Sequence, residues 1–157
     1  MDFWEVVHSF KIPYGLANAL YLPYVIDFNK KANSKRYADI ARTLCLNGNT
    51  DDQLVDSLTD LLRSLNKTLN LPLTLQEVGV NQADFEKQMD QMAAGAVEDP
   101  CTRSNPRELS VEQMKQIYIA AFKARKSTFN SSIKTVTALD FVCFVHAGRF
   151  YCLEAAF

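Results

Sequence analysis

The chain has 157 residues, of which 48% are hydrophobic, so it is long and apolar enough for one domain with a buried core. Its formal net charge of -1 gives no overall field that would attract nucleic acid or an acidic membrane surface. No run of eighteen apolar residues is present, so the sequence predicts no membrane span and no membrane partner.

The cellular compartment is predicted from the N-terminus and the cysteines. The first ten residues, MDFWEVVHSF, lack the basic region, apolar region and cleavage site of a secretory signal. Four cysteines in a chain of this length do not resemble a disulfide framework. We therefore expect a soluble, cytoplasmic protein whose cysteines are reduced.

A largely apolar helix is predicted from Gly15 to about Asn29, and a helix of this kind is normally buried. Pro13 lies just outside its start, and Gly15 is expected to let a loop approach closely. Pro23 lies inside the helix and has no backbone N–H for the carbonyl of Ala19. We therefore expect a kink or a break at Pro23.

Amphipathic helices are predicted along the rest of the chain up to residue 124, because apolar residues recur there every three or four positions. The stripes are Tyr37, Ile40, Ala41 and Leu44; Leu54, Leu58, Leu61, Leu62, Leu65 and Leu69; Phe85, Met89, Met92, Ala93 and Ala96; and Val111, Met114, Ile117, Tyr118, Ala121 and Phe122. Capping residues precede several of them. These are Thr50 with Gln53, Thr74 with Glu77, Asn81, and Ser110 with Gln113.

The composition changes after Lys123. Residues 123–134, KARKSTFNSSIK, are basic and polar, which is typical of a linker. Residues 135–157 are rich in β-branched and aromatic residues without a helical period, which predicts an irregular or β-prone tail. A strand at 139–147 would need a partner. The predicted organisation is a frayed segment at 1–11, an all-α domain at 12–124, and a linker with an unrelated apolar tail at 125–157.

The tail also contains a cluster of metal-binding residue types. Cys143, His146 and Cys152 provide three ligands at spacings of three and six, which match no closed structural zinc site. We therefore expect no metal there. The sequence contains no nucleophile elbow, P-loop or dinucleotide fingerprint.

Four motifs, in order, resemble segments of the iron-containing (group III) alcohol dehydrogenases. They are IPYGLANAL at 12–20 followed by Leu22-Pro23, similar to PHGxANAxLLP; RYADIA at 36–41, similar to RYAxIA; Gly79-Val80 with Asp84, similar to GVxxxD; and DPCTRSNPR at 99–107, similar to DxCTxxNPR. The resemblance covers roughly residues 10–122. It implies a helical bundle like the C-terminal domain of those enzymes, with a dehydroquinate synthase-like fold.

The resemblance also implies a chemistry. In that family an N-terminal α/β domain binds NAD(P), and Fe²⁺, or sometimes Zn²⁺, lies in the cleft beside a helical C-terminal domain. One aspartate and three histidines of the helical domain hold the metal, which acts as a Lewis acid on the alcohol oxygen while hydride passes to the cofactor. The family reaction is oxidation of primary alcohols or reduction of aldehydes.

This sequence departs from the family at the metal ligands. Tyr14 stands where the motif has a metal-binding histidine, and a phenol, which must lose its proton, is a poorer ligand than imidazole at pH 7. We expect the Tyr14 ring to fill the space left by the metal. His8 resembles a second ligand segment, HxLG, but it precedes Tyr14 by only six positions. The remaining ligands and the phosphate site belong upstream of Met1, so we expect no metal, iron or zinc, and no NAD(P) on the isolated chain.

The 99–107 motif supplies candidate cleft residues. Cys101 matches a family position near the substrate cleft, and its thiol would become reactive only beside a cation such as Arg103 or Arg107. Otherwise Cys101 is an ordinary loop residue. Asn105, Pro106 and Arg107 are expected to shape the loop, with Arg107 bound to backbone carbonyls or to an acidic partner.

Three interpretations of function remain open. The chain is a truncated or degenerate alcohol dehydrogenase that is inactive alone, a non-enzymatic helical interaction module, or one half of a split dehydrogenase that needs a separate nucleotide-binding domain. The interaction module would self-associate through apolar residues exposed by the missing partner. The residues expected on that surface are Leu16, Leu20, Tyr21 and Tyr24.

Overall fold

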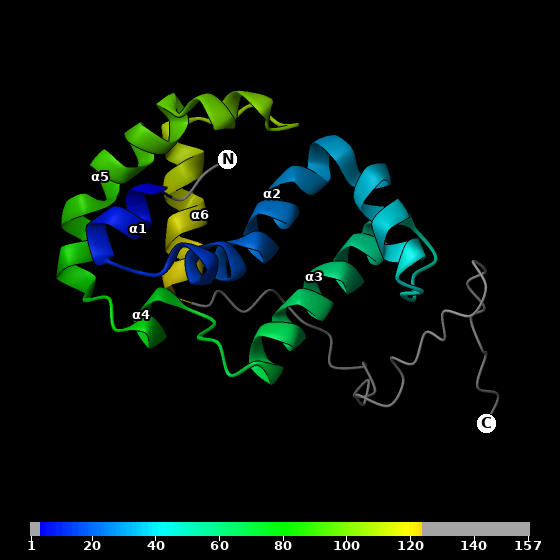
Figure 1. Cartoon of the computed structure of the whole chain (residues 1–157). Helices are drawn as coiled ribbons and strands as arrows, with labels where there is room; N and C mark the ends of the chain where they lie inside the picture. Colours follow the sequence, from blue (N-terminus) through cyan, green and yellow to red (C-terminus); the bar gives the residue numbers. More distant parts are fainter. Residues whose placement is uncertain (1–3, 124–157) are drawn as a thin grey trace. The chain divides into compact units, whose positions relative to one another are not determined.

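A computed structural model describes residues 4–123, which form helices joined by loops, with no strand among them. In chain order the elements are α1 (Trp4–Phe10), α2 (Tyr14–Thr43), α3 (Asp51–Thr68), α4 (Leu75–Val78), α5 (Gln82–Glu98), the 3-10 helix η1 (Pro100–Ser104) and α6 (Val111–Lys123). The predicted all-α class is confirmed for this part of the chain (Figure 1). Within it, no helix combines the length and the apolar character needed to cross a membrane. The expectations for 125–157, including Cys143, His146 and Cys152, lie outside the described residues.

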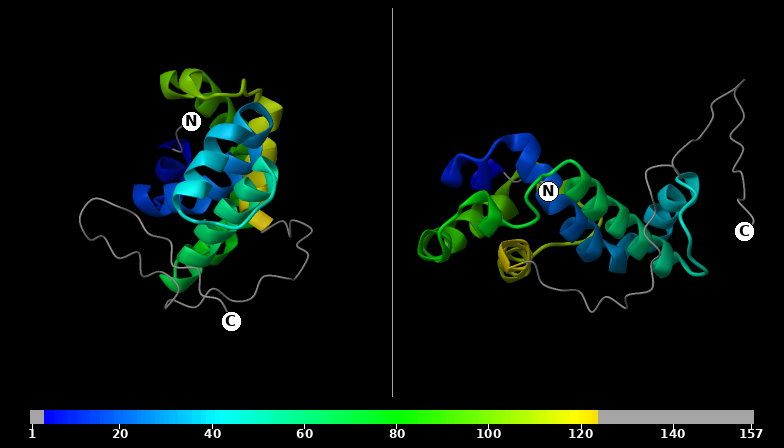
Figure 2. Two further views of the ribbon diagram at one scale, coloured as in Figure 1. Left: turned by 90° about the vertical axis from the view of Figure 1, so that its right-hand side faces the viewer. Right: turned by 90° about the horizontal axis from the view of Figure 1, so that it is seen from below.

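The buried side chains form two clusters. The first core joins α1, the N-terminal half of α2, α4, α5 and α6. The second core lies between α3 and the part of α2 that starts at Ile26. Helices α2 and α3 lie side by side in Figures 1 and 2, and α2 contributes to both cores.

The stripes predicted on α5 and α6 form the centre of the first core. Most of these side chains are buried, while Met89 and Val111 are partly buried. The rings of Phe85 and Phe122 stack with centroids 4.4 Å apart, an arrangement that adds to the energy of area burial. The sequence therefore predicted these two helix faces correctly.

The stripes predicted on α2 and α3 are only partly buried. Leu54 and Leu58 are in the second core, but Leu65 is 49% exposed. On α2, Ile40 is 46% exposed, while the neighbouring Ala41 is buried. Small side chains let two helices approach closely, so α3 packs on the alanine face of α2 and leaves the larger Ile40 outside.

Helix α1 corrects the expectation that 1–11 is frayed. Residues 4–10 form a helix that packs against α5 and α2, and Val6 is fully buried. A Cβ added at Gly95 of α5 would lie 3.0 Å from Cδ of Glu5, so the two helices are close. The apolar side chains of Val6 and Phe10, four residues apart, stabilise α1 by burial in the first core.

Helix α2 corrects the expectation of a kink at Pro23. The helix continues through Pro23, and its non-helical residue is Asn33, with φ -146° and ψ 40°. Pro23 cannot donate to the carbonyl of Ala19, but the Asn66 side chain of α3 does so, at 2.7 Å. The freed carbonyl is thus satisfied by a neighbouring helix, and the helix is not broken there.

Gly15 does not have the role expected of it. In the described part of the chain, a Cβ added at Gly15 would have no heavy atom within 4 Å, apart from its own helix and its chain neighbours. Among residues 4–123, no loop makes a close approach that would require glycine at this position.

The predicted helix starts are confirmed by their hydrogen bonds. The amide of Gln53 donates to Oγ1 of Thr50, at 3.2 Å, and that of Glu77 to Oγ1 of Thr74, at 3.1 Å. Ser110 and Gln113 form a reciprocal capping box, and Asn81 caps α5. These local bonds fix where each helix begins, independently of how the helices pack.

Candidate functional site

The two candidate metal ligands lie on either side of the turn between α1 and α2. His8 is exposed in the last turn of α1, and Tyr14 opens α2. Tyr14 is 48% exposed, so its ring does not fill a vacated pocket as we expected. Between them Lys11 has a left-handed backbone, with φ 53°, and Ile12 is buried in the first core, which anchors the turn.

The described residues do not fit the iron site that the family resemblance implies. That site takes three histidines and one aspartate, whereas the chain contains two histidines, His8 and His146. Among residues 4–123, no group of three or more His, Cys, Asp or Glu side chains is placed to hold a metal ion. These residues therefore support no catalytic step through iron.

The loop that carries the 99–107 motif is held against α2 by a pair of asparagines. Nδ2 of Asn29 donates to Oδ1 of Asn105 at 2.8 Å, and Nδ2 of Asn105 donates back to Oδ1 of Asn29 at 2.8 Å. Asn29 is 2% exposed, so its buried amide oxygen depends on Asn105, and its amide nitrogen is shared between Asn105 and Oη of Tyr37. Nδ2 of Asn105 also donates to the carbonyl of Arg107, at 2.6 Å, which closes the loop on itself.

Arg107 makes the second attachment of this loop to α2. Its guanidinium lies over the ring of Phe28, 4.0 Å from the centroid, and donates to the Phe28 carbonyl at 2.9 Å. This agrees with the prediction that Arg107 binds a backbone carbonyl. Arg107, which we considered as a cation that could activate Cys101, therefore fixes the loop.

Cys101 is exposed in η1, and the backbone around it is well defined by hydrogen bonds. Its amide donates to Oδ1 of Asp99 at 2.6 Å, and Oγ1 of the buried Thr102 donates to the Ala96 carbonyl at 2.6 Å. The loop thus presents Cys101 to solvent on a fixed turn. These hydrogen bonds hold Cys101 in place. Its position near a substrate cleft stays a prediction.

Sequence reasoning missed the two buried asparagines that organise this region. Asn29 and Asn66 both lie in or beside apolar stripes, and a buried amide needs hydrogen-bond partners. That signal was available in the sequence. The partners were not, because Asn105 is 76 residues from Asn29 and Ala19 is 47 residues from Asn66.

The apolar surface expected for self-association is wrong in half of its residues. Leu20 and Tyr21 are buried in the first core, and Leu16 and Tyr24 are partly buried against it. Other large apolar residues are exposed in the N-terminal part of α2 and the C-terminal part of α3. They are Tyr14, Leu22, Leu65 and Leu69.

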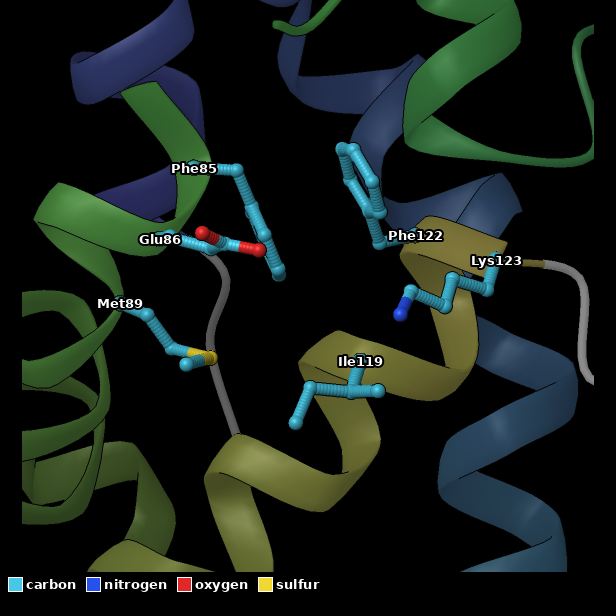
Figure 3. A pocket seen from close by; sticks show the side chains of 6 residues that line it. All are labelled: Phe85, Glu86, Met89, Ile119, Phe122 and Lys123. Carbon is cyan, nitrogen blue, oxygen red and sulfur yellow. The ribbon is translucent and has the colours of Figure 1, made fainter. Parts of the chain in front are cut away.

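A hollow between α5 and α6 is too small to be a substrate site (Figure 3). It holds about 100 Å³ and is lined by Phe85, Glu86, Met89, Ile119, Phe122 and Lys123. Sites for small molecules and cofactors usually have about 300–1,000 Å³. The hollow is better explained as an imperfection in the packing of the two helices.

Comparison with known proteins gives consistent matches. A model of the Fe-containing alcohol dehydrogenase family, C-terminal part, matches residues 4–122. The chain is 45% identical over 120 residues to an NADPH-dependent butanol dehydrogenase of Clostridium saccharobutylicum, a match that covers 76% of this chain and 31% of that protein. It is 38% identical over 112 residues to an alcohol dehydrogenase of Thermococcus barophilus, covering 70% of this chain and 28% of the relative.

Solved structures agree with the sequence matches. The iron-containing alcohol dehydrogenase from Thermococcus thioreducens superposes with a TM-score of 0.63 at 31% identity, over 75% of this chain and 29% of that one. A 1,3-propanediol oxidoreductase gives a TM-score of 0.69 at 28% identity, over 75% of this chain and 30% of that one. The chain thus spans less than a third of the length of these relatives. In sequence, in fold and in the order of its motifs, the chain belongs to the Fe-containing alcohol dehydrogenase family and corresponds to its C-terminal helical domain.

Proposed function

We propose that the chain is the helical domain of an NAD(P)-dependent, cytoplasmic alcohol dehydrogenase, and that the 157-residue polypeptide does not oxidise alcohols by itself. The family reaction, interconversion of primary alcohols and aldehydes, would require a nucleotide-binding domain and a complete metal site. The cytoplasmic location rests on the cysteine pattern of the sequence.

One observation carries the proposal of inactivity. The position that resembles the family's metal-binding histidine is Tyr14, an exposed phenol, and the described residues bring no three donors together. A site with one or two protein ligands binds a catalytic cation weakly, because each missing donor must be replaced by water.

Metal content and turnover test this proposal together. The purified chain is incubated with Fe²⁺ under anaerobic conditions, or with Zn²⁺, and desalted. Bound metal is then measured by mass spectrometry, and 1-butanol oxidation is followed with NAD⁺ and with NADP⁺. We expect metal well below one equivalent and no reduced cofactor, with a full-length family member as the positive control.

Two results of the same assay would contradict the proposal. One equivalent of metal that is lost in Tyr14→Phe or His8→Ala would show that these two side chains form a real site. Turnover that follows the metal would overturn the proposal of inactivity. The Tyr14→His variant restores the motif histidine, yet it should remain below one equivalent because the other donors are still missing.

We also propose that a nucleotide-binding domain covers the exposed apolar end of the α2–α3 pair. The contact between Asn66 and Ala19 places the C-terminal part of α3 beside the N-terminal part of α2. Tyr14 and Leu22 of that part of α2 and Leu65 and Leu69 at the C-terminal end of α3 are exposed. Clustered apolar residues on a surface usually mark an interface, and this one includes the position of the family's metal ligand.

Co-expression with the nucleotide-binding domain of a relative tests this interface. We expect a complex that Leu65→Asp and Leu69→Asp disrupt, because each places a charge in an apolar contact. Ile40→Asp is the matched control, since Ile40 is 46% and Leu65 49% exposed. Equal effects of Ile40→Asp and Leu65→Asp would contradict the proposed location. Oligomers of the chain alone in light scattering, disrupted by the same two variants, would favour the self-associating module instead.

A further inference from the structure

The kink of α2 lies between most of the contacts that α2 makes with the first core and most of those that it makes with the second core. Before it, α2 packs into the first core as far as Phe28, although Ile26 already belongs to the second core. After it, Tyr37, Ala38 and Ala41 pack into the second core with α3. Asn33, the residue with non-helical dihedral angles, lies in the short stretch between these contacts.

The Asn29 side chain connects the two sides of this kink. Its Nδ2 donates to Oη of Tyr37 at 3.3 Å and to Oδ1 of Asn105 at 2.8 Å, so one amide group contacts both the far side of the kink and the loop. Arg107 fixes the same loop to the Phe28 carbonyl one residue earlier. In Figure 1 the segment after α5 extends toward the middle of α2, where these contacts occur.

The other side-chain contacts near the kink are weaker. Nζ of Lys30 pairs with Asp56 at 2.6 Å, and Ser34 donates to Asp52 at 2.9 Å, but both bonds are exposed to solvent. Exposed pairs contribute little to stability, whereas a buried amide that loses its partner carries the full cost of desolvation. The asparagine pair is therefore the strongest polar restraint at this point.

We propose that the loop 99–107 acts as a latch. Its contacts with Asn29 and Phe28 keep α2 in its kinked conformation and so limit local opening of the second core. The second core includes residues 34–43 of α2 and 51–58 of α3. When the latch is removed, this region opens more often, while α5 and α6, which do not depend on the kink, keep their stability. The loop that presents Cys101 is thereby coupled to a helical pair that is distant from it in sequence.

Amide hydrogen exchange on the full chain tests the latch. In Asn105→Ala we expect exchange within 34–43 and 51–58 to become about tenfold faster, the order of effect of losing a buried hydrogen bond. Peptides from 85–96 and 111–122 should change by less than about twofold. Ser104→Ala is the control, because Oγ of Ser104 donates to the Cys101 carbonyl within the same loop and does not bind α2.

Two results would overturn the proposal. Equal acceleration in all helices would mean that Asn105 contributes only to global stability, and no acceleration within 34–43 would mean that the loop does not restrain the kink. If Asn105→Ala does not fold, Arg107→Lys provides a milder test. That variant keeps the charge but loses the planar contact with Phe28, and it should accelerate the same two segments by a smaller factor.

Discussion

At the scale of single residues, the most informative position is Asn66. Its Nδ2 satisfies the Ala19 carbonyl that Pro23 leaves without a helical partner, and the side chain is only 7% exposed. From the sequence alone, neither Asn66 nor Pro23 indicates that the other lies nearby. Together they show how the carbonyl that a proline frees inside α2 obtains a donor while the helix continues.

We predict that Asn66→Ala lowers the free energy of unfolding by about 2 kcal/mol, the cost of a buried carbonyl without a donor. In a Pro23→Ala background the loss should be much smaller, because an alanine at this position has a backbone N–H that donates to the Ala19 carbonyl. Urea unfolding of the two single variants and the double variant measures this coupling. Thr68→Ala, which removes an exposed bond to the Ser64 carbonyl in the same helix, is the control. Strictly additive effects would contradict the compensation.

The carboxyl group of Asp60 leads to a prediction about pH. Burial raises the pKa of Asp60 above its ordinary value, although the Arg63 guanidinium, 3.5 Å away, opposes the shift. The folded state therefore holds the proton more tightly than the unfolded state, so this group makes the protein less stable as pH rises above the unfolded pKa of about 3.9. Asp60→Asn removes that dependence. The free energy of unfolding of the variant, relative to wild type, should increase from pH 3 to pH 7. A constant difference would show that the ion pair with Arg63 balances burial, and a decrease would show that the ion pair outweighs it.

At the scale of elements, local sequence signals were reliable and packing signals were not. The capping residues Thr50, Thr74, Asn81 and Ser110 act as predicted, because a cap needs only residues within four positions of itself. The face that a helix buries depends on which neighbour it meets. The stripes predicted on α5 and α6 are the faces that pack in the first core. On α2 and α3, Ile40 and Leu65 were also predicted to be buried, but they are exposed.

Two glycines, Gly48 in the loop before α3 and Gly15 in the first turn of α2, should respond in opposite ways to alanine. At Gly48, a Cβ would lie 2.8 Å from the amide nitrogen and 2.9 Å from Cγ of Leu54, and that amide is fixed by its bond to the Thr50 carbonyl. Gly48→Ala should therefore destabilise the chain by about 1–3 kcal/mol. Gly15→Ala meets open space in the first turn of α2 and should stabilise it by about 0.5–1 kcal/mol. Thermal unfolding followed by circular dichroism gives both signs. A lower midpoint for Gly15→Ala would indicate a contact at this position that the described residues do not include.

At the scale of the whole described region, the family motifs predicted the fold but not the division into two cores. The resemblance located the 99–107 loop and identified Tyr14 as the substituted ligand position, but it did not include α1 in the helical domain. It could not show that Asn105 binds Asn29, since that contact joins residues 76 positions apart. The sequence also placed Leu20 and Tyr21 on a surface, whereas they lie in the first core. Long-range pairing is the part of the structure that periodicity and spacing do not determine.

The buried amide of Asn66 also has a consequence for covalent modification. Asn66-Lys67-Thr68 has the form of an N-glycosylation acceptor, and the atom that would carry the sugar is Nδ2. In the folded chain that nitrogen is enclosed between α2 and α3 and is bonded to the Ala19 carbonyl. A glycan there would take the place of the group that completes the α2 backbone at Pro23. Attachment of an oligosaccharide and formation of this helical pair are therefore mutually exclusive events.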